Sequence, residues 1–356
     1  MDPKTSTGRL AGLSCPLPAN DEETIQMAHG GGGRMTQRLL ESVFLPAFDN
    51  PSLALQHDGA FLDVRAGRMA VSTDSFVISP IFFPGGDIGS LAVHGTVNDL
   101  AMCGARPIAL TAGFILEEGL PMEALRRIVG SMRAAAAGVG VSIVTGDTKV
   151  VDRGKGDGVY INTTGLGMVP DGIRISPDAA RPGDRILISG TIADHGIAIM
   201  SVREGLQFET AVESDSAPLA DLVAGLLERV GGGVHVLRDP TRGGVASVLC
   251  EIAGASRAGI RIEEGLVPVR EQVRGACEIL GLDPLYVANE GKCIAIVAPE
   301  HADAALEAMR RHPLGAQAAI IGSVVDEHHG RVVQKSRIGG LRIVERLSGE
   351  PLPRIC

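Results

Sequence analysis

Two neighbouring stretches, Gly89 to Cys103 (GSLAVHGTVNDLAMC) and Ile108 to Ile115 (IALTAGFI), indicate the fold class of this chain. The first is typical of a helix, and the second is a short apolar run typical of a buried strand. A second helix is predicted from Pro121 to Ala137, with the proline in its first turn, and a second strand from Val141 to Val144. This alternation predicts an α/β or α+β protein.

The pattern continues in both directions along the chain. Before the first helix, strands are predicted at Phe61–Val64 and Arg68–Ser79, and a further strand follows at Gly158–Val169. The stretch Pro170–Gly183 contains three prolines and predicts a domain boundary, after which Arg185–Ser189 opens a second alternating series. In that series we expect helices at 217–230, 243–254, 268–280 and 300–311, and strands at 293–298 and 319–325.

These segments predict two domains with a short extension at each end. The expected units are a flexible leader (1–24), an N-terminal ATP-binding and dimerisation domain (25–170), a C-terminal α/β domain (171–346) and a mobile tail (347–356). A length of 356 residues is enough for two ordinary domains with their own cores. The likeliest ligand site of such a protein is the cleft between its halves or a subunit interface.

Composition narrows the possible functions. Hydrophobic residues make up 45% of the chain and charged residues 21%, which are globular values, and a net charge of −9 argues against nucleic-acid binding. We see neither an apolar run long enough for a membrane span nor a secretory signal at the start. The six cysteines form no CxxC pair, which favours reduced thiols and a cytoplasmic location.

The chain ends in Pro351-Leu352-Pro353-Arg354-Ile355-Cys356. A cysteine beside the terminal carboxylate is difficult to bury, and the two prolines favour an extended conformation. The nine residues from Ser348 onward reach about 30 Å at roughly 3.3 Å each, so the thiol can move between a partner and a pocket of its own protein. The alternative is a frayed end whose last residue is a cysteine.

The segment His29-Gly30-Gly31-Gly32-Gly33 precedes a helix-like run, Met35 to Val43. Glycine N–H groups without side chains can surround phosphate oxygens, and the following helix N-terminus adds a favourable dipole. A hinge after the leader explains the same residues equally well.

Several acidic residues stand at the ends of apolar runs, where α/β proteins place ligand groups. They are Asp58, Asp74, Asp87, Asp99 and Asp147. Taken singly, each is a candidate turn or cap residue, but as a set they predict a site for Mg²⁺ and phosphate. Two further residues are candidates for acid–base chemistry: Lys149 follows Gly-Asp-Thr, and Glu290 stands just before the apolar strand at 293–298.

Together these segments resemble the HypE family of hydrogenase-maturation carbamoyl dehydratases, in the superfamily of aminoimidazole ribonucleotide synthetase. The resemblance runs from about residue 25 to the end of the chain. The matching stretches are His29–Gly33, Ser72–Gly89, Gly95–Gly104, Asp147–Val151, Asp194–Gly196, Arg238–Gly244, Leu280–Lys292 and Pro353–Cys356.

The resemblance implies a two-domain aminoimidazole ribonucleotide synthetase-like fold whose N-terminal sheet pairs across a homodimer. It also implies that Cys356 is carbamoylated by a HypF-like carbamoyltransferase. ATP then drives dehydration of the thiocarboxamide to a thiocyanate. The cyano group passes to iron held by a HypC–HypD-like scaffold and becomes a cyanide ligand of a nickel–iron hydrogenase.

The resemblance also implies roles for individual residues. Lys149 and Glu290 would handle the amide protons of the group carried by Cys356. The residues that would bind the nucleotide are His29, Gly30, Gly31, Gly32, Gly33, Asp74, Asn98 and Asp147, and those that would hold magnesium are Asp58, Asp74, Asp99 and Asp147.

Two alternatives remain open from the sequence. Selenophosphate synthetase belongs to the same superfamily and would need a reactive residue near the N-terminus, where this chain has Cys15 between Ser14 and Pro16. A non-catalytic scaffold would use the proline-containing tail as a docking peptide.

Overall fold

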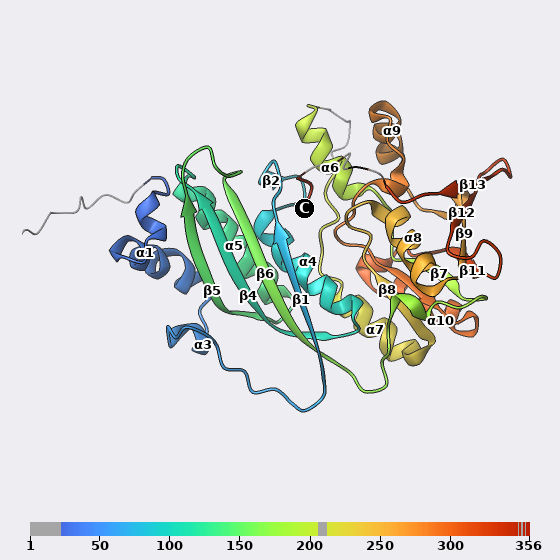
Figure 1. Ribbon diagram of the computed structural model, residues 1–356, viewed down its shortest axis with the longest axis horizontal. Helices are drawn as coiled ribbons and strands as arrows, with labels where there is room; N and C mark the ends of the chain where they lie inside the picture. Colours follow the sequence, from blue (N-terminus) through green and yellow to red (C-terminus); the bar gives the residue numbers. More distant parts are fainter. Residues whose placement is uncertain (1–22, 206–211, 348, 350–351, 353) are drawn as a thin grey trace, which may run out of the picture.

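Two β-sheets, one in each half of the chain, organise the structure, and the C-terminus lies between the two halves (Figure 1). The computed structural model describes residues 23–205, 212–347, 349, 352 and 354–356. The predicted leader therefore lies outside the described residues except for Glu23 and Thr24, and Thr24 forms a β-bridge with Pro121.

The N-terminal domain contains a four-stranded sheet in the order β1-β6-β4-β5. The strands are β1 (Arg68–Phe76), β4 (Arg106–Glu117), β5 (Ser142–Val151) and β6 (Val159–Val169), and the helices on one face are α4 (Ile88–Met102) and α5 (Met122–Gly138). Strand β6 is antiparallel to β1 and β4, whereas β4 and β5 are parallel and are connected through α5. The predicted helices and the strands of this sheet are confirmed.

The strand predicted at Phe61–Val64 is wrong. The segment has no strand partner, and the Phe61 side chain is 80% exposed. Its apolar residues favour a strand locally, but a strand needs a neighbour whose backbone groups pair with its own. Short helices precede it: η1 (Met27–Gly30), α1 (Arg34–Leu39), the π-helix η2 (Leu40–Phe44), α2 (Leu45–Ala47) and α3 (Pro51–Ala54). Of these, η1 and α3 contact β5, and η2 and α2 contact α5.

One face of this sheet is covered and the other is open. Thr163 of β6 is buried against α4, where its hydroxyl lies 2.5 Å from that of Thr96. On the opposite face, Val71 of β1 and Ile115 of β4 are 60% and 44% exposed. Side chains alternate between the two faces along each strand. The positions of Thr163, Val71 and Ile115 therefore assign every other side chain of their strands to the covered or the open face.

The C-terminal domain contains a seven-stranded sheet in the order β13-β12-β9-β11-β7-β10-β8. The strands are β7 (Arg185–Ile188), β8 (Val234–Arg238), β9 (Gly259–Glu263), β10 (Ile294–Val297), β11 (Ala319–Val325), β12 (Val332–Lys335) and β13 (Leu341–Val344). The helices are α6 (Asp194–Arg203), α7 (Ala220–Val230), α8 (Gly244–Ser256), α9 (Glu271–Leu280) and α10 (Ala302–Arg311). The predicted helices and strands of this half are confirmed, although the sequence did not indicate α6, β8, β9, β12 or β13.

A small ribbon, β2 (Phe82–Phe83) with β3 (Gly86–Asp87), leads into α4. Asp87 is the N-cap of α4: its Oδ1 accepts hydrogen bonds of 2.7 Å from Gly89 N–H and 3.1 Å from Ser90 N–H. Asp87 is therefore a capping residue, one of the two roles expected for it. No helix in the described part of the chain is long and apolar enough to cross a membrane.

Candidate active site

The terminal residues dock in the cleft between the domains. Backbone hydrogen bonds run from Val77 N–H to the Cys356 carbonyl oxygen (3.4 Å) and from Ser79 N–H to the Arg354 carbonyl oxygen (3.2 Å). The Ile355 side chain is buried, and its carbonyl oxygen lies 2.7 Å from Nε2 of His195. The tail that the sequence predicts to be mobile is thus docked in this structure, with the cysteine partly buried between the domains.

Glu290 lies against the thiol of Cys356. Burial raises the pKa of the Cys356 thiol, and the charge of Glu290 and a hydrogen bond to its carboxyl group raise it further. Burial also raises the pKa of Glu290 well above its usual range, and the carboxylates of Asp239 and Asp215 add to this effect. Among the described residues, Oε1 of Glu290 has no hydrogen-bond partner. The two candidate catalytic groups, a buried carboxyl group and a partly buried thiol, are therefore brought together.

The loop before β10 holds Glu290 rigidly, as the sequence predicts. Its backbone N–H donates to Oδ1 of Asp215 (3.0 Å), and Asp215 forms a buried ion pair of 3.0 Å with Lys292. The Glu290 carbonyl oxygen accepts a hydrogen bond of 3.1 Å from Nδ2 of Asn98. Both domains therefore fix the position of this carboxyl group.

Asn98 has an interdomain role that the sequence did not indicate. Besides the bond to Glu290, its Nδ2 donates to the Ala217 carbonyl oxygen (3.0 Å), and its Oδ1 accepts from Leu219 N–H (2.8 Å). Both amide protons are occupied by these backbone contacts, so the geometry does not support the predicted nucleotide contact. Asn98 instead ties α4 to the segment that carries Glu290.

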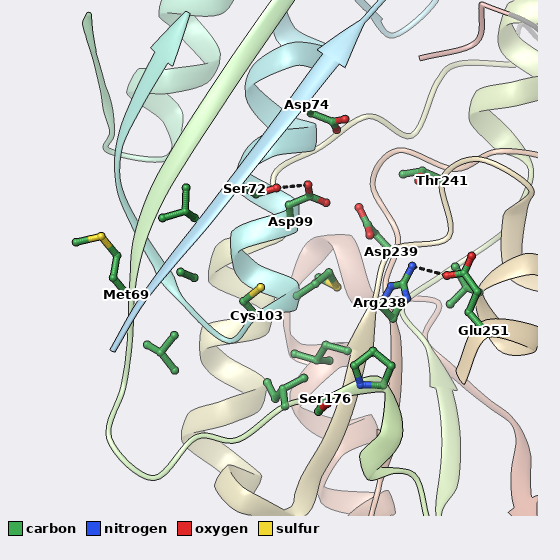
Figure 2. A pocket seen from close by; sticks show the side chains of 18 of the residues that line it. Met69, Ser72, Asp74, Asp99, Cys103, Ser176, Arg238, Asp239, Thr241 and Glu251 are labelled. Atoms are coloured by element: carbon green, nitrogen blue, oxygen red, sulfur yellow. Dashed lines mark hydrogen bonds and ion pairs between the residues drawn. The ribbon is translucent and has the colours of Figure 1, made fainter. Parts of the chain in front are cut away.

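An acidic cavity of about 550 Å³ opens beside this site, between β1, α4 and the end of β8 (Figure 2). Asp74, Asp99 and Asp239 line it together with Arg238 and Arg242. Ser72 donates a hydrogen bond of 2.5 Å to Oδ2 of Asp99. The cavity thus combines oxygen ligands with guanidinium groups, the two kinds of side chain that a nucleotide phosphate and its cation require.

Burial and mutual repulsion raise the pKa values of the carboxyl groups in this cavity. Burial and the neighbouring Asp99 raise the pKa of Asp74, while Arg242 opposes them. Burial raises the pKa of Asp99, and burial with the charge of Asp99 raises the pKa of Asp239 to about 7. The sequence missed Asp239 as a member of this set, although it lies in the loop Arg238–Gly244, which enters α8.

Lys149 and Asp147 lie on the other side of the N-terminal sheet. The Lys149 ammonium forms an ion pair of 3.2 Å with the Asp147 carboxylate, and both side chains are more than half exposed. In the strand register, Lys149 stands beside Ile115 of the open face, whereas Asp74 stands beside Thr163 of the covered face. A single chain therefore does not bring Lys149 to Glu290, or Asp147 to Asp74.

The glycine segment lies at the β5 edge of the N-terminal sheet. Its residues pack beside β5, so closely that a Cβ on Gly30 would lie 2.5 Å from the Val150 backbone nitrogen. His29 is buried, and its Nδ1 accepts a hydrogen bond of 2.9 Å from Gln26 N–H. Gly32 has a φ of +74° and Gly33 is the N-cap of α1. The segment thus leaves glycine backbone exposed at a helix N-terminus, an arrangement that suits both a phosphate loop and a hinge.

Asp58 is exposed in the loop before β1, so the four predicted magnesium ligands do not converge in one chain. Within the described residues, no group of three or more His, Cys, Asp and Glu side chains has an arrangement that could hold a metal ion. Sequence spacing shows which residues end strands, but not on which face of the sheet each side chain lies. Cys15, the residue on which the selenophosphate synthetase alternative rests, lies outside the described residues.

Both halves of the chain match models of known protein families. Residues 56–169 match the AIR synthase related protein N-terminal domain, and residues 181–335 match the corresponding C-terminal domain. The carbamoyl dehydratase HypE of Azotobacter vinelandii is 58% identical over 333 residues, which cover 94% of this chain and 97% of that protein.

Two solved structures are also similar. The crystal structure of hydrogenase maturation protein HypE in complex with ATP is 54% identical, with a TM-score of 0.90 over 94% of this chain and 100% of that chain. The HypE chain of a HypE–HypF complex is 51% identical, with a TM-score of 0.77 over 87% of this chain and 99% of that chain.

Proposed function

This chain belongs to the HypE carbamoyl dehydratases of the AIR synthase related family, and from that premise we propose that its own terminal thiol, Cys356, carries the group that is dehydrated. It is an enzyme of hydrogenase maturation. One observation carries the proposal: the docked tail places the Cys356 thiol against the buried carboxyl group of Glu290. That contact is the one a carbamoyl group on the sulfur would need.

The chemistry explains why ATP is required. The carbonyl oxygen of an S-carbamoyl group is a poor leaving group until a phosphoryl group is transferred to it from ATP. The C–O bond then breaks, phosphate leaves with the carbamoyl oxygen, and the nitrogen loses two protons as the C≡N bond forms. One of these protons ends on phosphate and the other is released, so the products are the thiocyanate, ADP and phosphate.

Glu290 is proposed as the group that accepts a proton from the nitrogen. Its raised pKa makes the carboxylate a stronger base than an exposed glutamate, and general base catalysis of this kind contributes about 10²–10⁴-fold. The buried side chains of Leu352 and Ile355 hold the tail in the cleft beside Glu290.

The acidic cavity is the proposed site for the ATP phosphates, as a solved relative binds ATP. Asp74, Asp99 and Asp239 are buried carboxyl groups whose charges raise one another's pKa values, but among the described residues no three such groups are arranged to hold a metal ion by themselves. We therefore propose that Mg²⁺ would take part of its oxygen ligands from these aspartates and the rest from the ATP phosphates. When bound, Mg²⁺ would neutralise phosphate charge as ATP reacts. Arg238 and Arg242 supply the guanidinium groups that phosphate oxygens prefer.

A homodimer would complete the site. The open face of the N-terminal sheet exposes Met69, Val71 and Ile115, an apolar surface suited to a second copy of the same sheet. In such a dimer, the glycine segment, Asp147 and Lys149 of one subunit would join the acidic cavity and Glu290 of the other. Lys149 would then neutralise phosphate and assist proton transfer, and Asp58 would extend the acidic set.

The proposed partners follow from the same tail. A solved HypE relative forms a complex with HypF, so we expect a HypF-like carbamoyltransferase to load Cys356 and a HypC–HypD-like scaffold to receive the cyano group on iron. Both steps require the tail to leave the cleft, because the docked thiol lies against Glu290 between the two domains. The described cysteines are all free thiols, as expected for a reducing compartment such as the cytoplasm.

Transfer of labelled oxygen tests this function. Protein carbamoylated on Cys356 with an oxygen-18 carbonyl is mixed with Mg–ATP, and the phosphate is analysed by mass spectrometry. Label in phosphate, in amounts equal to the thiocyanate formed, is the expected result. Unlabelled phosphate with full thiocyanate formation would exclude phosphorylation of the carbamoyl oxygen.

A further inference from the structure

We propose that the cleft around Arg354–Cys356 is a binding site for a peptide carboxy terminus, and that it accepts the tail sequence supplied as a separate molecule. The inference rests on the proposed role of Cys356 and extends the substrate class from the enzyme's own tail to a separate peptide. The substrate would be an S-carbamoylated peptide ending in Arg-Ile-Cys, whether or not it is joined to the enzyme.

The first support is main-chain pairing. Val77 and Ser79 follow directly after β1, which ends at Phe76, and their N–H groups bond to the carbonyl oxygens of Cys356 and Arg354. The tail therefore runs antiparallel to the continuation of β1, as an added strand would. Backbone hydrogen bonds of this kind bind extended peptides independently of how the peptide is tethered.

The second support is a pair of side-chain donors on one face of α6. His195 Nε2 bonds to the Ile355 carbonyl oxygen at 2.7 Å, and the Arg203 guanidinium contacts the carbonyl oxygens of Arg354 and Ser79. These two residues are eight positions apart, about two helical turns, so they lie on the same side of the helix. The C-terminal domain thereby binds the carbonyl groups of two successive tail residues. The N-terminal domain binds the tail through the backbone that follows β1.

The third support is recognition of side chains. Ile355 and Leu352 are 4% and 6% exposed and belong to a buried apolar cluster to which both domains contribute. Arg354 Nη1 forms an ion pair of 3.0 Å with Oδ1 of Asp157, in the loop between β5 and β6. The cleft thus selects an apolar residue next to the cysteine and a basic residue before it.

These contacts are made by residues 352 and 354–356, so a peptide of that sequence carries the same groups without the preceding chain. The covalent link raises the local concentration of the tail to roughly the millimolar range, and a free peptide must be supplied at a comparable concentration. The chemical step is unchanged: ATP and the S-carbamoyl peptide give the peptide thiocyanate, ADP and phosphate.

The test uses a chain shortened to end at Gly349 and a synthetic Leu-Pro-Arg-Ile-Cys peptide that carries an S-carbamoyl group. With Mg–ATP, we expect saturable conversion of the peptide to its thiocyanate, followed by mass spectrometry. A peptide with glutamate in place of arginine should be converted with about two- to five-fold lower kcat/KM, the usual worth of a partly exposed ion pair. The variant Asp157→Lys should reverse that preference, whereas Asp152→Lys in the same loop should not.

The full-length protein gives a second measurement that does not depend on truncation. Asp157→Lys should speed alkylation of Cys356, and adding Arg354→Glu should restore its protection. The inference is overturned if the full-length enzyme dehydrates its own tail, the shortened chain converts no peptide and the charge exchange fails to restore protection. In that outcome the proposed function stands. Absence of thiocyanate on the full-length protein would reject the proposed function itself.

Discussion

Nε2 of His195 donates a 2.7 Å hydrogen bond to the carbonyl oxygen of Ile355, the residue directly before the terminal cysteine. A carbonyl oxygen can only accept, so the ring proton is on Nε2, and Nδ1 is left to accept from Ser214 Oγ at 2.8 Å. The docked tail thus requires a proton on Nε2, and burial, which lowers the pKa of His195, favours the neutral ring in which Nδ1 accepts. His195 lies in a stretch that the sequence comparison singled out without giving it a role.

Tail docking should weaken in mild acid. Burial lowers the pKa of His195 below its ordinary 6.5, the Ile355 bond and Asp215 oppose that shift, and Arg203 adds to it. The docked state favours the neutral ring, so docking is fully stable above the pKa of the released histidine and is lost as the pH falls below it. Digestion by a carboxypeptidase should release Cys356 faster at about pH 5.5 than at about pH 7.5.

The variant His195→Gln is the matched control, because it keeps an amide donor but does not titrate. It should remove the acid-dependent part of the release while retaining a docked tail at neutral pH. Equal acid dependence in this variant would show that another group controls docking.

Mixed dimers should reveal whether the site is shared. Lys149→Ala and Glu290→Gln should each abolish dehydration, since each removes one of the proposed proton-handling groups. If Lys149 of one subunit serves Glu290 of the other, a mixed dimer contains one intact site. Equal mixing then restores about a quarter of wild-type activity, because half of the dimers are mixed and half of their sites are intact.

Thiocyanate formation after co-refolding or co-expression of the two variants measures this recovery. A mixture that stays inactive, although mixed dimers are detected by native mass spectrometry, would locate both groups in one subunit.

The docked thiol should react slowly. The pKa of Cys356 is raised above its ordinary value of 9.0, so its thiolate fraction at neutral pH is smaller than in a free peptide of the same sequence. Iodoacetamide labelling followed by mass spectrometry of the terminal peptide compares the two directly. Equal rates for the protein and the free peptide would mean that the tail is undocked in solution.

Alanine substitutions at two glycines distinguish a role in packing from a role in ATP binding. Gly30→Ala should lower thermal stability and ATP affinity together, because its Cβ would meet the Val150 backbone. Gly33→Ala meets nothing within 4 Å and has a φ of −92°, so the fold should tolerate it. Loss of ATP binding by Gly33→Ala at unchanged melting temperature would indicate that phosphate approaches this backbone, and normal ATP binding would remove Gly33 from the site.

Local sequence patterns predict most helices and strands of the fold, but they predict only part of the site. The helix at Gly89–Cys103 and the strand at Ile108–Ile115 are uninterrupted segments rich in apolar and small residues, and both are confirmed. Phe61–Val64 has the composition of a strand but lacks a partner, which no local pattern reveals. Helix α6 was missed, although it carries two of the tail contacts.

For the site, the sequence indicated Glu290 and Cys356, and the structure brings them together. It grouped Asp147 with Asp74 and Asp99. In one chain, however, Asp147 lies on the open face of the N-terminal sheet, whereas Asp74 lies on the covered face. Strand ends can be read from a sequence, but the face of each side chain depends on register with neighbouring strands. Asp239 escaped attention because its role depends on β8 meeting α4 across the domain interface.

The most direct test of the whole account is to locate the cyano group after one turnover. Wild-type protein is incubated with a carbamoyl donor, its transferase and Mg–ATP, and the terminal peptide is fragmented by tandem mass spectrometry. The account predicts a thiocyanate on the sulfur of Cys356 and none anywhere in Cys356→Ala. A cyano group bound to another residue, or one that forms equally in Cys356→Ala, would contradict it.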